Sequence, residues 1–282
     1  KTSFWKLPLE GVLRTRFDSF RYEGFTWTPF GADIFFSGNE IRLETKKAEL
    51  CGINTPGILK ISPGKIQLDF KPVAENSDLD SALNCLWNRK DLAHGNFNFE
   101  GHVFTQAQKE VLIQNLQGEM ELAGENGRIY RFGLLAKIFA LLNVTEIISG
   151  NLPDLSKEGF AYNFLNIKAD LRNGRLGLKE AVIDSPSLEV VFKGDVDLTD
   201  KELDLTVLIA PFRTVDRIIK HIPLLKDVLQ GNLIAIPVRV TGNWEDPRIT
   251  PLSPSAVTSE VLGIMKRTLK LPVKIIQPLI KE

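Results

Sequence analysis

Alternation of apolar and polar residues is the feature that most constrains how this sequence can fold. Between residues 165 and 209 it recurs in four successive runs. The runs cover 165–171, 176–182, 188–198 and 203–209. Side chains point to opposite faces at successive strand positions, so a period of two indicates strands with one apolar and one solvated face. Asn173-Gly174, Ser185-Pro186-Ser187 and Thr199-Asp200-Lys201 separate the runs and are typical of tight reversals. This stretch therefore predicts an antiparallel meander.

Shorter strand-like runs fill the first 130 residues. We expect strands over 13–20, 25–30, 31–36, 40–45, 48–51, 59–61, 66–70, 95–102, 111–116 and 118–123. Asn126-Gly127 is a strong signal for a hairpin turn after the last of these. The spacing changes in between. Ala82 and Leu83 follow Leu79 by three and four residues, which places all three on one face of a helix. We expect a short helix near 77–89 with Ser77 as its N-cap.

Three more helices are expected in the second half, over 134–148, 214–229 and 255–270. The first is apolar nearly all round, so we expect it to be buried or to plug an otherwise open apolar surface. The third has an apolar stripe that runs beside basic residues. Its apolar members are Val257, Val261, Leu262, Met265 and Leu269.

The number of strands limits the possible architectures. Roughly fifteen strands exceed what one ordinary sheet holds, so the sheet must close, fold into a sandwich or curl into an elongated trough. Three modest helices are too few to cover the apolar face of so long a sheet. The alternation alone ranks a closed β-sandwich or barrel ahead of an open trough.

Six short stretches, taken in order, resemble the AsmA-like C-terminal region. They are GNLPDL at 150–155, EGFAY at 158–162, NG at 173–174, DSP at 184–186, KGDVDL at 193–198 and VTGNWEDP at 240–247. The resemblance covers roughly residues 131–252. It implies a mainly β fold, in which a long curled antiparallel sheet forms an elongated apolar groove with a few amphipathic helices. It also divides the chain into a repeated-strand region (1–130), the AsmA-like region (131–252) and a C-terminal amphipathic helix and tail (253–282).

The resemblance further implies a function. AsmA-like proteins include bridge-like lipid-transfer proteins, so we expect a module that carries phospholipid acyl chains along the groove between the inner and outer membranes. The residues expected to line the groove are Leu165, Ile167, Leu178, Val190, Phe192, Leu205, Val207, Ile236 and Val238. Lys266, Arg267, Lys270 and Lys274 are expected to contact a membrane or a partner, the alternative being the solvated face of a helix packed on the sheet.

The expected compartment is the periplasm, with a tether to the inner membrane by an N-terminal helix that is absent from this chain, and with envelope proteins as further partners. In an oxidising compartment Cys51 and Cys85 are expected to pair; two buried free thiols are the alternative. A second functional hypothesis is a periplasmic scaffold that assists outer-membrane assembly without binding lipid itself. The scaffold predicts a dry, packed interior, whereas the lipid module predicts an open apolar surface.

Other classes of function receive little support from the sequence. Charge is balanced at 35 basic and 35 acidic residues, so no overall field attracts nucleic acid. His94, His102 and His221 are scattered, and Asp78 and Asp80 stand where acidic residues favour a helix start. The sequence has no phosphate loop, nucleophile elbow or clustered ligand motif. We therefore expect neither an enzyme nor a cofactor or metal.

Overall fold

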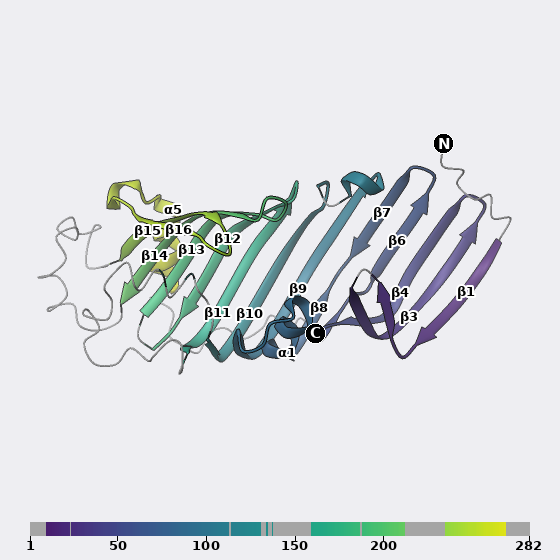
Figure 1. Cartoon of the computed structure of the whole chain (residues 1–282), viewed down its shortest axis with the longest axis horizontal. Coiled ribbons are helices and arrows are strands. Elements are labelled where there is room, and N and C mark those ends of the chain that lie inside the picture. The colour runs from purple at the N-terminus through teal and green to yellow at the C-terminus, as the bar shows by residue number, and fades with distance from the viewer. Residues whose placement is uncertain are drawn as a thin grey trace, which may run out of the picture.

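The computed structural model describes residues 10–22, 24–112, 114–130, 134, 137, 159–186, 188–211 and 235–268. These residues form one antiparallel sheet of 16 strands, which lie side by side along the long axis of the molecule (Figure 1). The strands are β1 (Glu10–Phe17), β2 (Phe20–Tyr22), β3 (Phe25–Ser37), β4 (Glu40–Leu50), β5 (Ile53–Asn54), β6 (Gly57–Ser62), β7 (Lys65–Phe70), β8 (Val73–Asp78), β9 (Ala93–Ala107), β10 (Gln117–Ile129), β11 (Phe160–Arg172), β12 (Arg175–Asp184), β13 (Leu188–Asp197), β14 (Glu202–Pro211), β15 (Ile236–Asn243) and β16 (Arg248–Pro251). The helices are α1 (Leu79–Trp87), α5 (Ser259–Thr268) and the short 3-10 turns η1 (Lys109–Val111) and η3 (Pro254–Ala256).

The sheet is open, with β1 at one end and β16 at the other. The expected mainly β fold and long antiparallel sheet are therefore confirmed, and the closed sandwich or barrel is not the architecture of the described chain. Among the described residues, the helices are all too short or too polar to cross a membrane.

Two short strand pairs, the hairpin β6–β7 and the pair β5–β8, fill the sheet between β4 and β9. One end of β4 pairs with β6 and its other end with β5, while β9 pairs with β7 and β8 in the same way. Pro56 lies between β5 and β6, and Pro72 lies between β7 and β8. Proline has no N–H to donate to a neighbouring strand, so it suits these breaks in the ladder. The carbonyls of Pro56 and Pro72 still accept hydrogen bonds from the N–H groups of Lys71 (2.8 Å) and Gly101 (2.9 Å). The sheet therefore stays continuous across the division.

The pairing registers place apolar residues in rows on one face of the sheet, which we call the apolar face. Residues directly opposite on neighbouring strands share a face. The first row, from β1 to β7, consists of Leu13, Ile34, Leu43, Leu59 and Leu68. The second, from β8 to β15, consists of Ala74, Phe99, Leu122, Ile167, Ala181, Phe192, Val207 and Val238. The apolar face thus extends along nearly the whole sheet.

The opposite face, the polar face, carries cross-strand ion pairs and one helix. Lys168 contacts Glu121 at 2.9 Å, and Arg239 contacts Asp204 at 3.0 Å. Near the C-terminal end, polar positions give way to apolar ones, on which α5 packs. Buried members of that contact include Val182, Val191 and Leu208 on the sheet and Val261, Ile264 and Met265 on α5. The expected stripe of the third helix therefore packs against the polar face, not the apolar one.

Several expected boundaries in the first half were wrong. Residues 25–36 form the single strand β3, and residues 40–50 form β4, because bulges in their pairing absorb the breaks in alternation. The expected strand 111–116 is absent where it is described: Val111 is exposed and ends η1, and residues 112 and 114–116 lie in the turn from β9 to β10. Asn126-Gly127 is not a reversal either, since β10 continues through it with a register shift against β9. Asn126 adopts the left-handed conformation, with φ of 50°, within this bulge.

The described helices lie where they were expected, but two of their starts differ. The short helix near 77–89 is α1, but its N-cap is Asp78, not Ser77, because the Asp78 carboxylate accepts the Ser81 N–H at 2.8 Å. Of the expected helix 134–148, Leu134 and Lys137 are described and both are helical. The expected helix 214–229 lies outside the described residues. The third helix begins later than expected, at Ser259, because η3 and a turn precede α5.

Candidate functional site

The nine residues expected to line a groove come from five neighbouring strands, β11 to β15. Eight of them belong to one apolar cluster. The ninth, Ile236, lies directly opposite Ile209 of that cluster and is half-buried. The alternation therefore identified a real surface, the C-terminal part of the apolar face. Contact with lipid at these positions stays a prediction.

Burial of this surface increases along the chain. Leu165, Ile167 and Leu178 are half-buried. Val190 and Val207 are 0 % exposed, and the inner positions of β15 are equally buried at Val238 and Val240. The middle of the apolar face on β13 to β15 is therefore closed to solvent, whereas the positions of Leu165, Ile167 and Leu178 are partly open.

Leu134 is one residue that contributes to this closure. It is helical, 8 % exposed and part of the same cluster. One helical turn further, Lys137 donates a hydrogen bond to the Asp246 carboxylate and another to the Pro247 carbonyl at 3.4 Å. The Lys137 ammonium lowers the pKa of Asp246 by this hydrogen bond and by its charge. The expected plug over the apolar face is thus present at Leu134; the rest of the expected helix lies outside the described residues.

The N-terminal part of the apolar face, from β1 to β10, is covered less completely, and many of its large side chains are partly exposed. Leu43, Leu59 and Leu68 are half-buried, and at the edge strand Leu13 and Phe17 are 52 % and 50 % exposed. Sequence reasoning placed no site residue here. The signal was nevertheless present, because the runs 40–45, 59–61 and 66–70 have the same period of two as the later ones.

One helix is fixed over this open part. Leu79 and Ala82 of α1 pack with Phe97 and Ala93 of β9, and Figure 1 shows α1 beside β8 and β9 at a long edge of the sheet. The Cys51–Cys85 disulfide, as the resemblance implied, joins α1 to the turn after β4. Both cysteines line an open depression of about 730 Å³ between α1 and the ends of β4, β5 and β8.

The basic residues proposed for membrane or partner contact are only partly described. Lys266 and Arg267 are exposed on α5, and Lys270 and Lys274 lie outside the described residues. Arg267 lies 3.5 Å from Glu180 of β12 on the polar face. Glu260, in the first turn of α5, pairs with Lys193 of β13 at 2.5 Å. At least one of the basic residues therefore contacts the sheet itself.

Two carboxyl side chains, Asp184 and Glu189, are buried at the closed end of the sheet. Asp184, at the end of β12, is 8 % exposed, and its carboxylate accepts a hydrogen bond from the Asn163 amide at 2.8 Å. Burial raises the pKa of Asp184, and the Asn163 hydrogen bond opposes this rise only in part. Sequence reasoning gave Asp184 no role, because the alternation along its strand places it among the polar, solvated positions.

Comparison with known proteins adds the family. No curated protein and no solved structure matches the chain. The family described as YhdP protein matches residues 40–249, about three quarters of the 282 residues. The match begins at the first residue of β4 and ends within β16, so it includes the open and the closed parts of the apolar face. The chain therefore belongs to the YhdP family, within the AsmA-like group of bridge-like lipid-transfer proteins.

Proposed function

We propose that this chain is a lipid-binding and transfer module that carries phospholipid acyl chains along its apolar face between the inner and outer membranes. The observation that carries the proposal is the continuity of the two apolar rows across successive strands, together with their partial exposure from β1 to β10. A monomeric protein rarely leaves so long an apolar surface without a ligand or partner.

The energetics suit this role. Moving an acyl chain of about sixteen carbons into water costs on the order of 10 kcal/mol, at about 0.8 kcal/mol per methylene. Rows of leucine, isoleucine and phenylalanine remove most of this cost by nondirectional contact. Because no directional bond fixes the chain at any one strand, a tail can move from each strand to the next. Headgroups would stay in water at the ends of the strands.

The family and the disulfide support a location in the cell envelope. Disulfides persist in oxidising compartments such as the periplasm, and the described chain has no free cysteine. We place the module in the periplasm, tethered to the inner membrane by another segment of the protein and working with envelope partners. In this proposal it binds lipid without catalysing a reaction.

A second candidate function, the periplasmic scaffold, is favoured by the closed end of the sheet. Val190, Val207 and Val238 are fully buried, as a dry, packed interior requires. In the scaffold hypothesis the open apolar face would be covered by protein, not by lipid. The two functions therefore differ in what occupies the first apolar row.

The test changes the open part of the face, because a charge at a fully buried valine would disrupt the fold. Leu59 and Leu68 lie directly opposite each other on β6 and β7, and Leu59→Asp/Leu68→Asp puts two carboxylates into the first row. Gln67 and Gln106 lie opposite each other on β7 and β9, are exposed and point to the polar face. Gln67→Asp/Gln106→Asp is therefore a control with the same added charge and the same pairing geometry.

Each protein is purified from cells and examined by native mass spectrometry and lipid extraction. We expect phospholipid with the wild-type chain and the control, and at least a tenfold loss with the Leu59/Leu68 variant. Circular dichroism checks that all three are folded. A folded wild-type chain that carries no phospholipid and takes up none from vesicles would exclude the lipid module and leave the scaffold.

A further inference from the structure

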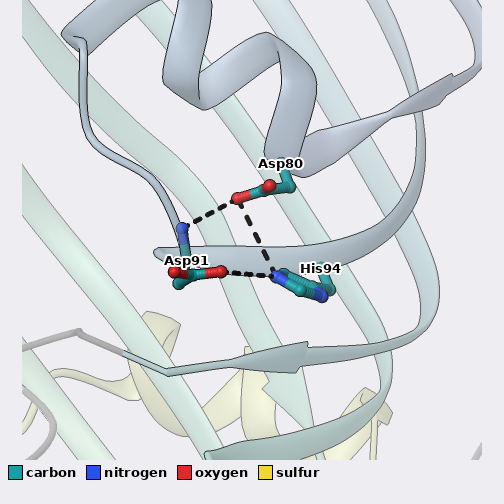
Figure 2. A group of neighbouring side chains, drawn as sticks. All are labelled: Asp80, Asp91 and His94. Atoms are coloured by element: carbon teal, nitrogen blue, oxygen red, sulfur yellow. Dashed lines mark hydrogen bonds and ion pairs between the residues drawn. The ribbon is translucent and has the colours of Figure 1, made fainter.

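Three side chains meet beside the start of β9, away from the apolar rows. Figure 2 shows Asp80 from the first turn of α1, Asp91 from the turn that follows α1, and His94 from β9. The His94 Nε2 atom lies 3.9 Å from an Asp80 carboxylate oxygen and 3.5 Å from an Asp91 carboxylate oxygen. One ligand atom from each residue lies within 4.8 Å of the other two.

These distances are unlike those of a hydrogen-bonded histidine. A ring N–H and a carboxylate oxygen in a charge-assisted hydrogen bond are about 2.7–2.9 Å apart. His102 and Asp69 in this chain approach that geometry at 3.0 Å. The His94 Nε2 atom instead lies farther than a strong hydrogen bond from both the Asp80 and the Asp91 carboxylate. Ligand atoms of a tetrahedral zinc site, with bonds of about 2.0–2.1 Å, are separated by about 3.3–3.4 Å. The His94–Asp91 distance of 3.5 Å is close to this separation, and the His94–Asp80 distance of 3.9 Å exceeds it by about 0.5 Å.

The three residues are held independently of any ion. The Asp80 carboxylate accepts the Asp91 N–H at 3.0 Å, which fixes the turn relative to the helix. The His94 ring packs edge-on against Tyr130, with centroids 4.8 Å apart. Helix α1 is itself fixed by its Asp78 cap and by the disulfide at Cys85. Binding an ion would therefore order little additional chain.

The chemistry of the three groups selects the ion. An imidazole nitrogen favours zinc over magnesium and calcium, which prefer oxygen ligands. Two carboxylates neutralise a divalent charge, and thiolate competition is absent because both cysteines are bridged. The three side chains are 30 %, 59 % and 46 % exposed in the order Asp80, Asp91 and His94, so water has access to complete the coordination.

We propose that Asp80, Asp91 and His94 bind one Zn²⁺ ion, with water as the remaining ligand. The ion joins the first turn of α1 and the following turn to β9. Because α1 packs on Phe97 and Ala93, zinc holds the helix in place over the apolar face. Binding requires a neutral imidazole, so it weakens in acid.

The test uses the oxidised, tag-free chain after treatment with a chelator, and titrates ZnCl₂ at pH 7 by isothermal calorimetry. We expect one zinc ion per chain. His94→Gln and Asp91→Asn should each weaken zinc binding at least tenfold, while His102→Gln, which changes the hydrogen-bonded histidine, should leave it unchanged. CaCl₂ should bind at least tenfold more weakly than ZnCl₂.

Hydrogen exchange gives a second readout that needs no lipid. Zinc should slow exchange of the amides of residues 88–94 in the wild-type chain and in His102→Gln, but not in His94→Gln. Circular dichroism without metal checks that the exposed substitutions leave the fold intact. Absence of zinc binding, or zinc binding that His94→Gln does not weaken, would overturn the proposal and leave a simple ion pair between His94 and the two carboxylates.

Discussion

The strands β4–β7 and the strands β12–β15 follow the same alternation but are covered differently. In the first region Leu43, Leu59 and Leu68 are half-buried. In the second, Val190 and Val207 are fully buried on the apolar face, while α5 covers the polar face behind them. The comparison teaches that a period of two determines which side of a strand is apolar. Whether that side is covered depends on other segments of the chain.

The largest expected effect contrasts one buried and one open position of the apolar rows. Val207→Asp places a charge where the side chain is 0 % exposed, and should lower the free energy of unfolding by more than about 4 kcal/mol. Leu59→Asp, at a half-buried position, should lower it by about 1–2 kcal/mol. Urea denaturation of both variants measures the difference. Equal losses would show that the two regions are equally closed and would remove the contrast.

The disulfide should matter next, and only in the open region. Cys51 and Cys85 are separated by 34 residues, so Cys51→Ser/Cys85→Ser should cost about 3–4 kcal/mol on chain-entropy grounds. Hydrogen exchange should become faster in α1 and the first half of β9, with β13 and β14 unchanged. The wild-type chain in reductant serves as the control and should behave like the double variant. Faster exchange throughout the sheet would mean that the two regions unfold as one unit.

The smallest expected effect concerns the cap of α1. Hydrogen bonds from the Ser81 side chain and backbone hold the pKa of Asp78 below its ordinary value of 3.8. Folding therefore favours the ionised carboxyl: its contribution is present above pH 3.8 and is lost as the pH falls through the lower, folded-state pKa. Asp78→Ala should cost about 1 kcal/mol at pH 7, and the difference from wild type should shrink below about pH 4.

Urea denaturation of Asp78→Ala at pH 7 and pH 3 measures this difference, and Asp78→Ser, which keeps a capping oxygen without the charge, is the matched control. The serine variant should retain most of the stability at pH 7. Because its capping oxygen does not titrate, that cap should contribute equally at pH 7 and pH 3. A constant gap between wild type and Asp78→Ala across the range would contradict the proposed role of the ionised carboxyl.

Local sequence was sufficient where the structure is locally determined. Asn173-Gly174 forms the turn between β11 and β12, with both residues at positive φ, and the alternation around it predicted the faces of β11 and of the first half of β12. Val182, which the alternation placed with Leu176 and Leu178, lies on the opposite face under α5, because a bulge after Leu178 shifts the register. Asn126-Gly127 has the same local signal but lies inside β10, which pairs with β9 on one side and β11 on the other. The backbone hydrogen bonds to β9 and β11 outweigh the turn preference of Asn126-Gly127. The residues next to this dipeptide carry no signal of that pairing.

The candidate sites divide in the same way. The apolar positions from Leu165 to Val238 could be assigned to one face because alternation is a property of each strand by itself, and their role as a lipid-binding lining stays a prediction. The Asp80, Asp91 and His94 cluster was missed because it depends on how α1 folds back against β9. Asp80 was interpreted as a helix-start residue, which it also is, and Asp91 and His94 are a weak i, i+3 pair outside any helix.

The order of the strands has a consequence for how quickly the molecule assembles. From β3 onward, each described strand pairs with a strand that precedes it in the sequence. Outside the division between β4 and β9 this is the immediate neighbour, with β3 pairing with both β1 and β2. Contacts between sequence neighbours close short loops, and such topologies reach the folded state faster than those that join distant segments. A chain that emerges from its N-terminus can therefore add one strand at a time to a finished edge. No described strand has to wait, unpaired and prone to aggregation, for a partner made much later.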